Sequence, residues 1–170
     1  MKKIFIYSSV DGQTIKICKN LQNRFNNSLL KSINQIKVED LEKSDQIIIG
    51  ASVRYGDHSK SLYGFIKNNK LILENKMTAF FSVNATARKK EKNKPSTNPY
   101  IIKFLKKTNW TPNKLKVFAG KIDFPQYGLF DKNVIKLIMW LTNGPTDTSK
   151  SYEFTNWSEV ESFAREINKF

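Results

Sequence analysis

Residues 4–14 of the chain read IFIYSSVDGQT, an apolar run followed by a short polar loop that leads into a helical pattern. The apolar run predicts a buried first strand. The loop, Ser9-Val10-Asp11-Gly12-Gln13-Thr14, offers hydroxyl groups, a glycine that lets the backbone approach a ligand closely, and the N-terminus of the following helix. These features predict a phosphate-binding loop. The alternative is an ordinary strand-to-helix turn around the Asp-Gly pair.

The loop lacks the signatures of two common phosphate sites. It contains neither the lysine of a P-loop nor the three spaced glycines of a dinucleotide fingerprint. The remaining features fit the terminal phosphate of a mononucleotide, and FMN is therefore the leading candidate for a cofactor.

The charge of the chain is strongly positive. A net charge of +14 on 170 residues predicts an anionic partner, which could be nucleic acid, an anionic lipid surface or a polyanionic small molecule. Ten of the cations lie between Arg88 and Lys116, where Glu91 is the one acidic residue. The alternative is a lysine-rich surface whose role is solubility. The length suits one compact domain over residues 1–170.

Cysteine usage indicates a reducing, cytosolic compartment. The single cysteine, Cys18, has no partner for an intramolecular disulfide and falls among apolar helix positions, which predicts a buried thiol. The longest apolar run elsewhere, residues 134–141, is interrupted by Lys136 and is far shorter than the roughly 20 residues that span a bilayer. We therefore expect no membrane-spanning segment.

Strand-like and helix-like segments alternate along the chain, which is typical of a parallel sheet with helices on both faces. The predicted strands are residues 3–7, 35–38, 46–50, 78–83 and 116–120. The predicted helices are a first one in which Ile17, Cys18, Leu21, Phe25 and Leu29 form the apolar stripe, and then residues 59–68, 99–107 and 157–169, the last with Asn156 as its N-cap.

The alternation stops after Gly120, where residues 121–143 form an insertion. From Phe130 the insertion reads as a short helix whose apolar residues cover more than one face, and residues 143–145 would end it. Such a helix either packs under a neighbouring loop or presents a hydrophobic patch. Because Lys132 and Lys136 flank the patch, insertion into a membrane interface is our hypothesis.

Open parallel sheets bind ligands beyond the carboxyl ends of their strands. This rule selects the loops at residues 9–14, 50–56 and 82–88, each of which follows a predicted strand. Each loop could be merely solvated, but their arrival at one sheet edge predicts a single shared site.

Other chemistries are poorly supported by the sequence. One histidine, His58, and one cysteine are too few for an ordinary zinc site, and we expect no metal. We expect His58 to lie on a surface loop. The chain has no GxSxG nucleophile motif and no suggestive carboxylate pair, so in an enzyme the cofactor would carry the reaction.

Several motifs together resemble one family. SVDGQT, GASVRYG, SVNATARKKEK, KLIMWL followed by PTDT, and FAREI occur in the same order as in the flavodoxin-like protoporphyrinogen IX dehydrogenases that pass electrons to quinone. The resemblance covers nearly the whole chain. The first loop is shared by many flavodoxin-like proteins, whereas the loop from Ser82 and the insertion are more specific.

The resemblance implies an α/β, flavodoxin-like three-layer fold with a five-stranded parallel sheet of order 2-1-3-4-5. It also implies non-covalent FMN and the six-electron oxidation of protoporphyrinogen IX to protoporphyrin IX in haem synthesis, with menaquinone or ubiquinone as acceptor. With the basic charge, it predicts a cytoplasmic protein in peripheral contact with the anionic cytoplasmic face of the inner membrane.

The resemblance also implies which residues bind the cofactor, by their positions in the matching motifs. The phosphate would be held by Ser9, Val10, Asp11, Gly12, Gln13 and Thr14. The isoalloxazine ring would be bordered by Ser52, Val53, Arg54, Tyr55, Ser82, Val83, Asn84, Ala85, Thr86, Ala87 and Arg88, with Asp147 close by. Arg54 and Arg88 are candidate contacts for the substrate's propionates.

Two other classes of function compete with this reading. A flavodoxin-like electron carrier or quinone reductase would share the fold, but the resemblance to carrier flavodoxins implies an acidic docking face, and +14 is the opposite sign. A nucleic-acid-binding domain would use the basic segment with Tyr100, Phe104 and Trp110. At helical spacing such aromatics are more often core residues, so we expect no nucleic-acid partner.

Overall fold

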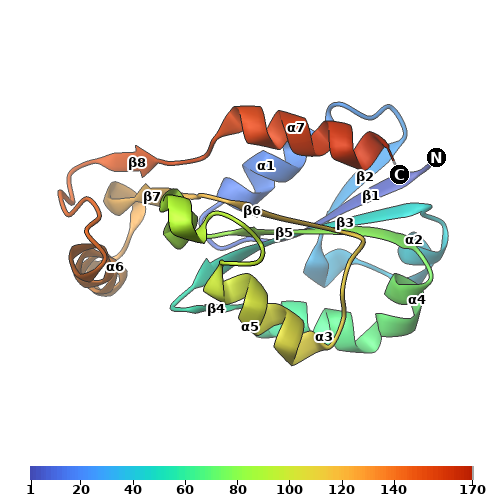
Figure 1. Ribbon diagram of the computed structural model, residues 1–170, viewed down its shortest axis with the longest axis horizontal. Coiled ribbons are helices and arrows are strands. Elements are labelled where there is room, and N and C mark those ends of the chain that lie inside the picture. The colour runs from blue at the N-terminus through green and yellow to red at the C-terminus, as the bar shows by residue number, and fades with distance from the viewer. Residues whose placement is uncertain (170) are drawn as a thin grey trace.

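The computed structural model describes residues 1–169 and contains a central parallel sheet. Its five parallel strands are β1 (Lys3–Ser8), β2 (Ser28–Ser32), β3 (Gln46–Arg54), β5 (Met77–Val83) and β6 (Lys114–Phe118). They lie in the order β2-β1-β3-β5-β6 (Figure 1). In terms of successive parallel strands this is 2-1-3-4-5, so the predicted topology is confirmed.

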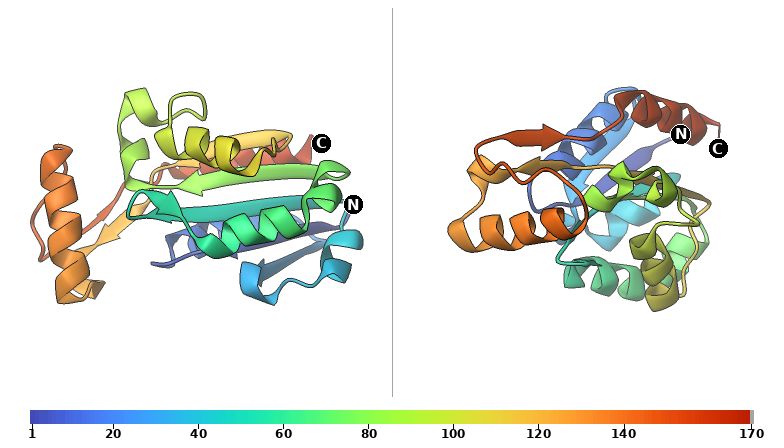
Figure 2. Two further views of the ribbon diagram at one scale, coloured as in Figure 1. Left: turned by 90° about the horizontal axis from the view of Figure 1, so that it is seen from below. Right: turned by 60° about the vertical axis from the view of Figure 1, so that its left-hand side comes forward.

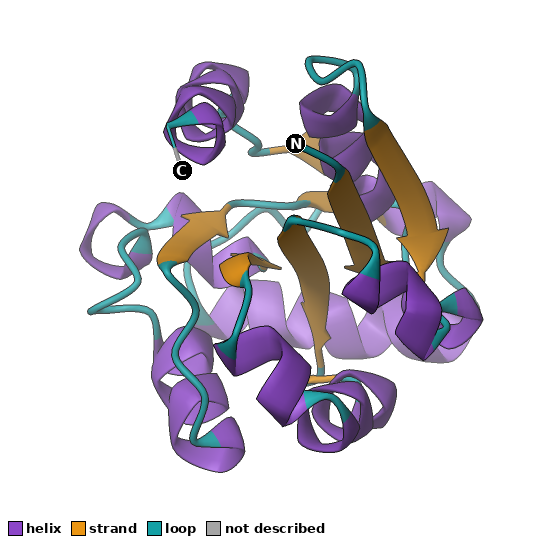
Figure 3. Ribbon diagram, turned by 90° about the vertical axis from the view of Figure 1, so that its right-hand side faces the viewer, coloured by secondary structure: helices purple, strands orange, loops and turns teal. Residues whose placement is uncertain are grey.

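Helices cover both faces of the sheet, as the alternation predicted (Figures 1 and 3). One face carries α1 (Gln13–Gln22) and α7 (Trp157–Asn168). The other carries α3 (Lys60–Asn68), α5 (Pro99–Thr108) and the short α2 (Val38–Glu42) and α4 (Lys70–Glu74). The predicted N-cap of the last helix is confirmed, because the Asn156 side chain accepts from the backbone N–H of Ser158.

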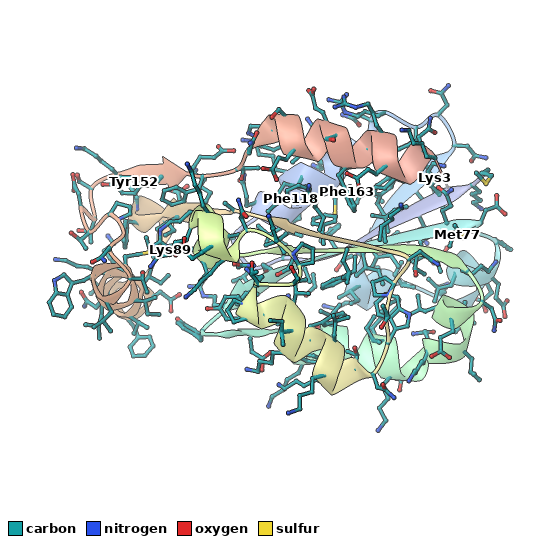
Figure 4. All side chains as sticks on the ribbon, viewed as in Figure 1. Lys3, Met77, Lys89, Phe118, Tyr152 and Phe163 are labelled. Atoms are coloured by element: carbon teal, nitrogen blue, oxygen red, sulfur yellow. The ribbon has the colours of Figure 1, made fainter. Side chains whose placement is uncertain are left out.

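Alternation along the strands divides the core into two layers. Phe5 and Phe81 pack with α1 and α7, whereas the neighbouring Ile4 and Phe80 pack with the helices of the opposite face. In Figure 4 the labelled Phe118 and Phe163 meet between the sheet and α7, and their ring centroids are 5.8 Å apart. The side-chain period of two in a strand therefore produces both layers from one set of strands.

The predicted strand at residues 35–38 is wrong. The second strand is instead β2, and residues Ile33–Gln35 form the 3-10 turn η1, followed by α2 from Val38. The spacing of the apolar residues there resembles that of a strand, but these residues form a turn that packs against one face of the sheet. β2 is an edge strand whose residues are half-buried or exposed, so its sequence carries no clear apolar alternation.

The first helix is shorter than predicted, because it ends at Gln22. Phe25 therefore lies in the following loop, where its ring stacks on Phe5 with centroids 5.8 Å apart, and Leu29 lies on β2. The other predicted helix positions hold: Ile17, Cys18 and Leu21 are fully buried. Burial raises the pKa of the Cys18 thiol, so the thiol stays protonated and unreactive, as expected for a buried cysteine.

The insertion leaves the sheet after β6 and returns before α7. It runs through β7 (Lys121–Asp123), the 3-10 turn η4 (Phe124–Gln126), α6 (Leu129–Leu141) and β8 (Ser151–Glu153). β7 and β8 pair antiparallel, so the two legs of the insertion hold each other. Figure 2 shows α6 lying across one end of the sheet, apart from the other helices. The predicted helix in this segment is confirmed.

Within residues 1–169, none of the helices combines the length and apolar character that a membrane span requires.

Candidate functional site

The three predicted loops meet at the carboxyl ends of the strands and line one cleft. The space inside it that water-sized spheres can reach is about 140 Å³. The insertion forms the far wall of the cleft. The lining residues are Ser9, Asp11, Gln13, Thr14, Ser52, Val53, Arg54, Tyr55, Gly56, Val83, Asn84, Ala85, Thr86, Tyr100, Gly120, Lys121, Ile122, Tyr127, Ile135, Ile138 and Met139.

The first loop presents the N-terminus of α1 to this cleft. Gly12 has φ of 81°, a left-handed conformation that favours glycine, and its N–H donates to Ser9 Oγ at 3.2 Å. Side chains of Ser59, Asn98 and Asn156 cap α3, α5 and α7, whereas none of the described side chains caps α1. The first-turn N–H groups of α1 therefore remain available to an anion.

Thr14 gives independent evidence that a ligand belongs here. Its side chain is 1% exposed, and Oγ1 has no hydrogen-bond partner among the described residues. A buried hydroxyl without a partner costs roughly 1 to 3 kcal/mol, so such groups usually have one. A phosphate oxygen at the N-terminus of α1 would supply that partner, and the loop therefore fits the phosphate of FMN.

The side chains of two residues of this loop do not face the expected phosphate position. The Gln13 side-chain amide donates to Glu153 Oε1 (3.0 Å) and Thr155 Oγ1 (2.8 Å), which ties the loop to the chain around β8. Val10 is exposed and is not part of the cleft lining. Any contact of Gln13 with a phosphate would therefore come from its backbone.

The second loop is a tight hairpin. β3 continues past its predicted end at Gly50 as far as Arg54 and then turns back into β4 (Asp57–His58). The two turn residues, Tyr55 and Gly56, both have positive φ, as a two-residue hairpin turn requires. The hairpin projects the side chains of Arg54 and Tyr55 along the cleft.

Arg54 is the most heavily paired cation of the cleft. Its guanidinium forms ion pairs with Asp11, at 2.5 Å, and with Asp131 of α6, and it lies 5.3 Å from the ring centroid of Tyr127. Burial acts against its charge, but hydrogen bonding with Tyr55 and the charge of Asp11 raise the pKa of Arg54. Arg54 therefore links the first loop to the insertion.

Hydrogen bonds between buried polar groups hold the third loop in place. Asn84 Oδ1 accepts from the N–H of Ala87, and Asn84 Nδ2 donates to Ser82 Oγ at 3.1 Å. Val83, Asn84, Ala85 and Thr86 line the cleft, whereas Ser82 and Ala87 are buried behind it. Four of the seven predicted residues of this loop thus line the cleft, and Ser82 and Ala87 support them through hydrogen bonds with Asn84.

The prediction that His58 lies on a surface loop is wrong. His58 is 5% exposed, on β4, with Nε2 3.0 Å from Ser82 Oγ. Burial lowers its pKa to about 4, with Lys103 and Lys107 adding to the effect and Asp57 opposing it. His58 is therefore a neutral support of the third loop. Within residues 1–169, no cluster of His, Cys, Asp or Glu side chains could hold a metal ion.

Arg88 and Asp147 lie outside the cleft lining. The Arg88 guanidinium donates to the carbonyl oxygens of Ala85 and Thr142, each at 2.9 Å, and to Thr142 Oγ1 at 3.0 Å. Asp147 is exposed and binds the side chains of Ser149 and Lys150. Arg88 thus reaches the C-terminal end of α6.

Sequence reasoning missed the wall that the insertion contributes. Ile135, Ile138 and Met139 of α6 line the cleft, as does Tyr127, whose ring lies beside the Arg54 guanidinium. Met139 packs with Ile122 and Phe124 in a small apolar cluster of its own. The helical spacing of Ile135, Ile138 and Met139 was a usable signal, but the sequence alone does not say which loop they face.

The comparisons with known proteins agree with this geometry. Residues 4–149 match the family model described as a flavodoxin domain. The chain is 38% identical over 171 residues to the protoporphyrinogen IX dehydrogenase [quinone] of Escherichia coli (strain K12), covering 98% of this chain and 94% of that protein. It is 35% identical to the protein of the same name from Leishmania major, covering 98% of this chain and 74% of that protein.

Solved structures support the fold. Oxidised flavodoxin 1 from Bacillus cereus superposes with a TM-score of 0.56 at 15% identity, covering 99% of this chain and 98% of that chain. A flavodoxin from the domain Archaea gives a TM-score of 0.50 at 18% identity over 69% of this chain and 83% of that one. At these identities the likeness establishes the flavodoxin-like fold.

Proposed function

This chain belongs to the flavodoxin-domain family of quinone-dependent protoporphyrinogen IX dehydrogenases, and we propose that it is an FMN-dependent member that oxidises protoporphyrinogen IX to protoporphyrin IX. The six electrons pass to a quinone, either menaquinone or ubiquinone. The reaction completes the porphyrin ring system in haem synthesis.

One observation carries this proposal: Thr14, whose buried hydroxyl has no partner among the described residues, lies at a helix N-terminus and lines a broad cleft. The apolar helix α6 forms the opposite wall of that cleft. The helix N-terminus and Thr14 suit the phosphate of FMN. The hairpin residues Ser52 to Tyr55 and the loop from Asn84 to Thr86 border the space where a flavin ring would lie. When bound there, FMN supplies two-electron redox chemistry.

The protein's own part is to bind and orient the substrate and to exclude water. The apolar side chains of Ile135, Ile138 and Met139 face the cleft and offer a surface for a large macrocycle. The Tyr100 and Tyr127 rings add flat apolar area to the same space. Removal of this wall would leave the cleft open to solvent on the insertion side.

The test is a reaction under anaerobic conditions. FMN-loaded protein is mixed with protoporphyrinogen IX and a soluble naphthoquinone or benzoquinone, and porphyrin fluorescence is followed. We expect quinone-dependent fluorescence that the FMN-free protein does not give, and the faster quinone identifies the preferred class of acceptor. Quinone reduction by the chemically reduced protein without any porphyrin product would contradict the proposal and favour a quinone reductase.

We further propose that the protein acts at the cytoplasmic face of the inner membrane, with α6 inserted into the lipid interface. The outer face of α6 supports this. Its exposed side chains are Leu129, Phe130, Leu137, Trp140 and Leu141, with exposures between 55% and 81%. Lys132 and Lys136 on the same helix would contact anionic headgroups, each worth about 1 kcal/mol near such a surface.

The double substitution Trp140→Ser and Leu137→Ser is expected to weaken binding to anionic phospholipid vesicles by about ten-fold or more, because each large apolar side chain contributes about 1.5 to 3 kcal/mol when fully buried. Co-sedimentation measures the binding, which should also weaken as salt is raised. Leu71→Ser is the matched control, since Leu71 is 77% exposed on α4, at the opposite end of the molecule (Figure 1). Equal loss in both variants would argue against α6 as the membrane contact.

A further inference from the structure

The insertion helix α6 is held at its two ends by two arginines, Arg54 from the second loop and Arg88 from the third. We propose that Arg54 and Arg88 are positioning residues that couple occupancy of the cleft to the position of α6. This deepens the proposed function, because it takes FMN as the ligand of the cleft. It also replaces the expectation that these arginines contact propionates.

At the N-terminal end of α6 the connection runs through Asp131. Its carboxylate accepts from the Arg54 guanidinium and from the Tyr55 hydroxyl, so both hairpin residues reach the first turn of the helix. The same guanidinium is paired with Asp11 of the phosphate loop at 2.5 Å. The Arg54 side chain is 16% exposed, whereas the Asp11 and Asp131 side chains are each 36% exposed, so solvent partly screens both ion pairs. A single side chain therefore joins the phosphate loop to α6.

At the C-terminal end the connection runs through Arg88. Its guanidinium donates to the backbone oxygen and hydroxyl of Thr142, the residue that caps α6, and also to the carbonyl of Ala85 on its own loop. A cation at this end is favoured by the negative end of the helix dipole. The packing leaves little slack, since a Cβ at Gly144 would lie 2.8 Å from Arg88 Nη2 and 2.0 Å from Met139 Cε.

Between these two ends, apolar packing holds α6 only along a narrow stripe. Met139 is the buried residue of the helix within the described chain, and Ile135 packs partly beside it. The outer face of α6 is exposed. A helix with so little buried apolar surface is easily displaced, so its contacts with Arg54 and Arg88 determine its position.

Ligand binding in the cleft would also restrict the motion of the first and the third loop. A phosphate at the N-terminus of α1 would order the loop that carries Asp11, and a flavin ring against residues 84–86, which line the cleft, would order the loop that carries Arg88. Because each arginine ends on α6, ordering of the loops favours one position of the helix. By linkage, a fixed α6 in turn favours occupancy of the cleft.

Hydrogen exchange measured by mass spectrometry, with and without FMN, tests this coupling. In the wild-type protein we expect FMN to slow exchange in residues 9–14 and also in residues 129–142, the latter by about five-fold or more, as a typical coupling between sites predicts. In Arg88→Gln and in Asp131→Ala, residues 9–14 should still be protected, whereas protection of residues 129–142 should be lost at the end whose connection is removed.

Lys89→Gln is the matched control, because it removes one positive charge next to Arg88 from a side chain without a hydrogen bond or ion pair among residues 1–169. It should behave as the wild type, and Arg88→Lys should restore part of the protection. With active protein, Arg88→Gln should raise the KM for the porphyrinogen several-fold more than it changes kcat, because the wall of the cleft is misplaced while the cofactor site is intact.

The outcomes separate the two proposals. Wild-type protein in which FMN protects neither segment would contradict the FMN-dependent function. Protection of residues 9–14 without any effect on residues 129–142 in the wild type would overturn the coupling alone. Full protection of residues 129–142 in both Arg88→Gln and Asp131→Ala would likewise show that the arginines do not transmit it.

Discussion

Thr14→Val is expected to weaken FMN binding by about 10-fold to 150-fold, which corresponds to the loss of one hydrogen bond to a charged group. The same substitution should leave the stability of the FMN-free protein unchanged or slightly higher. The reason is that Thr14 Oγ1 is buried without a partner among the described residues, so a methyl group of similar size removes an unsatisfied polar atom. Flavin fluorescence titration and urea unfolding measure the two quantities.

A second threonine provides the control for this substitution. Thr78 is also 1% exposed, but its hydroxyl donates to Asn113 Oδ1 at 3.2 Å. Thr78→Val should therefore lower the free energy of unfolding by about 1 kcal/mol and leave FMN affinity unchanged. Wild-type FMN affinity in Thr14→Val would show that the phosphate does not use this hydroxyl and would remove the strongest structural support for the site.

Gly50→Ala is expected to lower the free energy of unfolding by about 3 kcal/mol, the upper end of the usual cost of overpacking. Gly50 on β3 lies directly opposite Phe81 on β5, and a Cβ there would lie 2.3 Å from Phe81 Cζ. The ring has no free space to move into, because Phe118 and Phe163 pack against it with centroids 5.4 Å and 6.1 Å away. Urea unfolding followed by circular dichroism measures the loss.

Two further variants make this prediction specific. In Gly64→Ala of α3 the added Cβ meets no atom within 4 Å apart from the neighbouring residues and backbone of its own helix, so this change should raise the free energy of unfolding by about 0.5 to 1 kcal/mol through helix propensity. Adding Phe81→Leu to Gly50→Ala should restore about 1 kcal/mol or more relative to the sum of the single changes. Additive losses in that double variant would refute the proposed collision.

The sequence determined the features that depend on local pattern. The apolar run before Ser9, the glycine at position 12 and the helix after it were sufficient to predict a strand, a phosphate loop and α1, because each is fixed by neighbours along the chain. The rule that ligands lie at the carboxyl ends of parallel strands then placed the three loops at one cleft. Of the three aromatic residues expected in the core, Phe104 and Trp110 are almost fully buried, whereas Tyr100 is half-buried and lines the cleft.

Packing between remote segments determines which distant groups meet. The sequence cannot show that Arg54 and Arg88 end on α6, because Asp131 and Thr142 lie 77 and 54 residues further along the chain. His58 is buried because β4 pairs with β3 and places this side chain next to the third loop. A strand of only two residues leaves no sequence pattern from which that pairing could be predicted. β2 was missed because an edge strand needs little apolar pattern when the sheet supplies its hydrogen bonds. Local sequence thus specified the elements and the loops, while packing between remote segments fixed the partners of each charge.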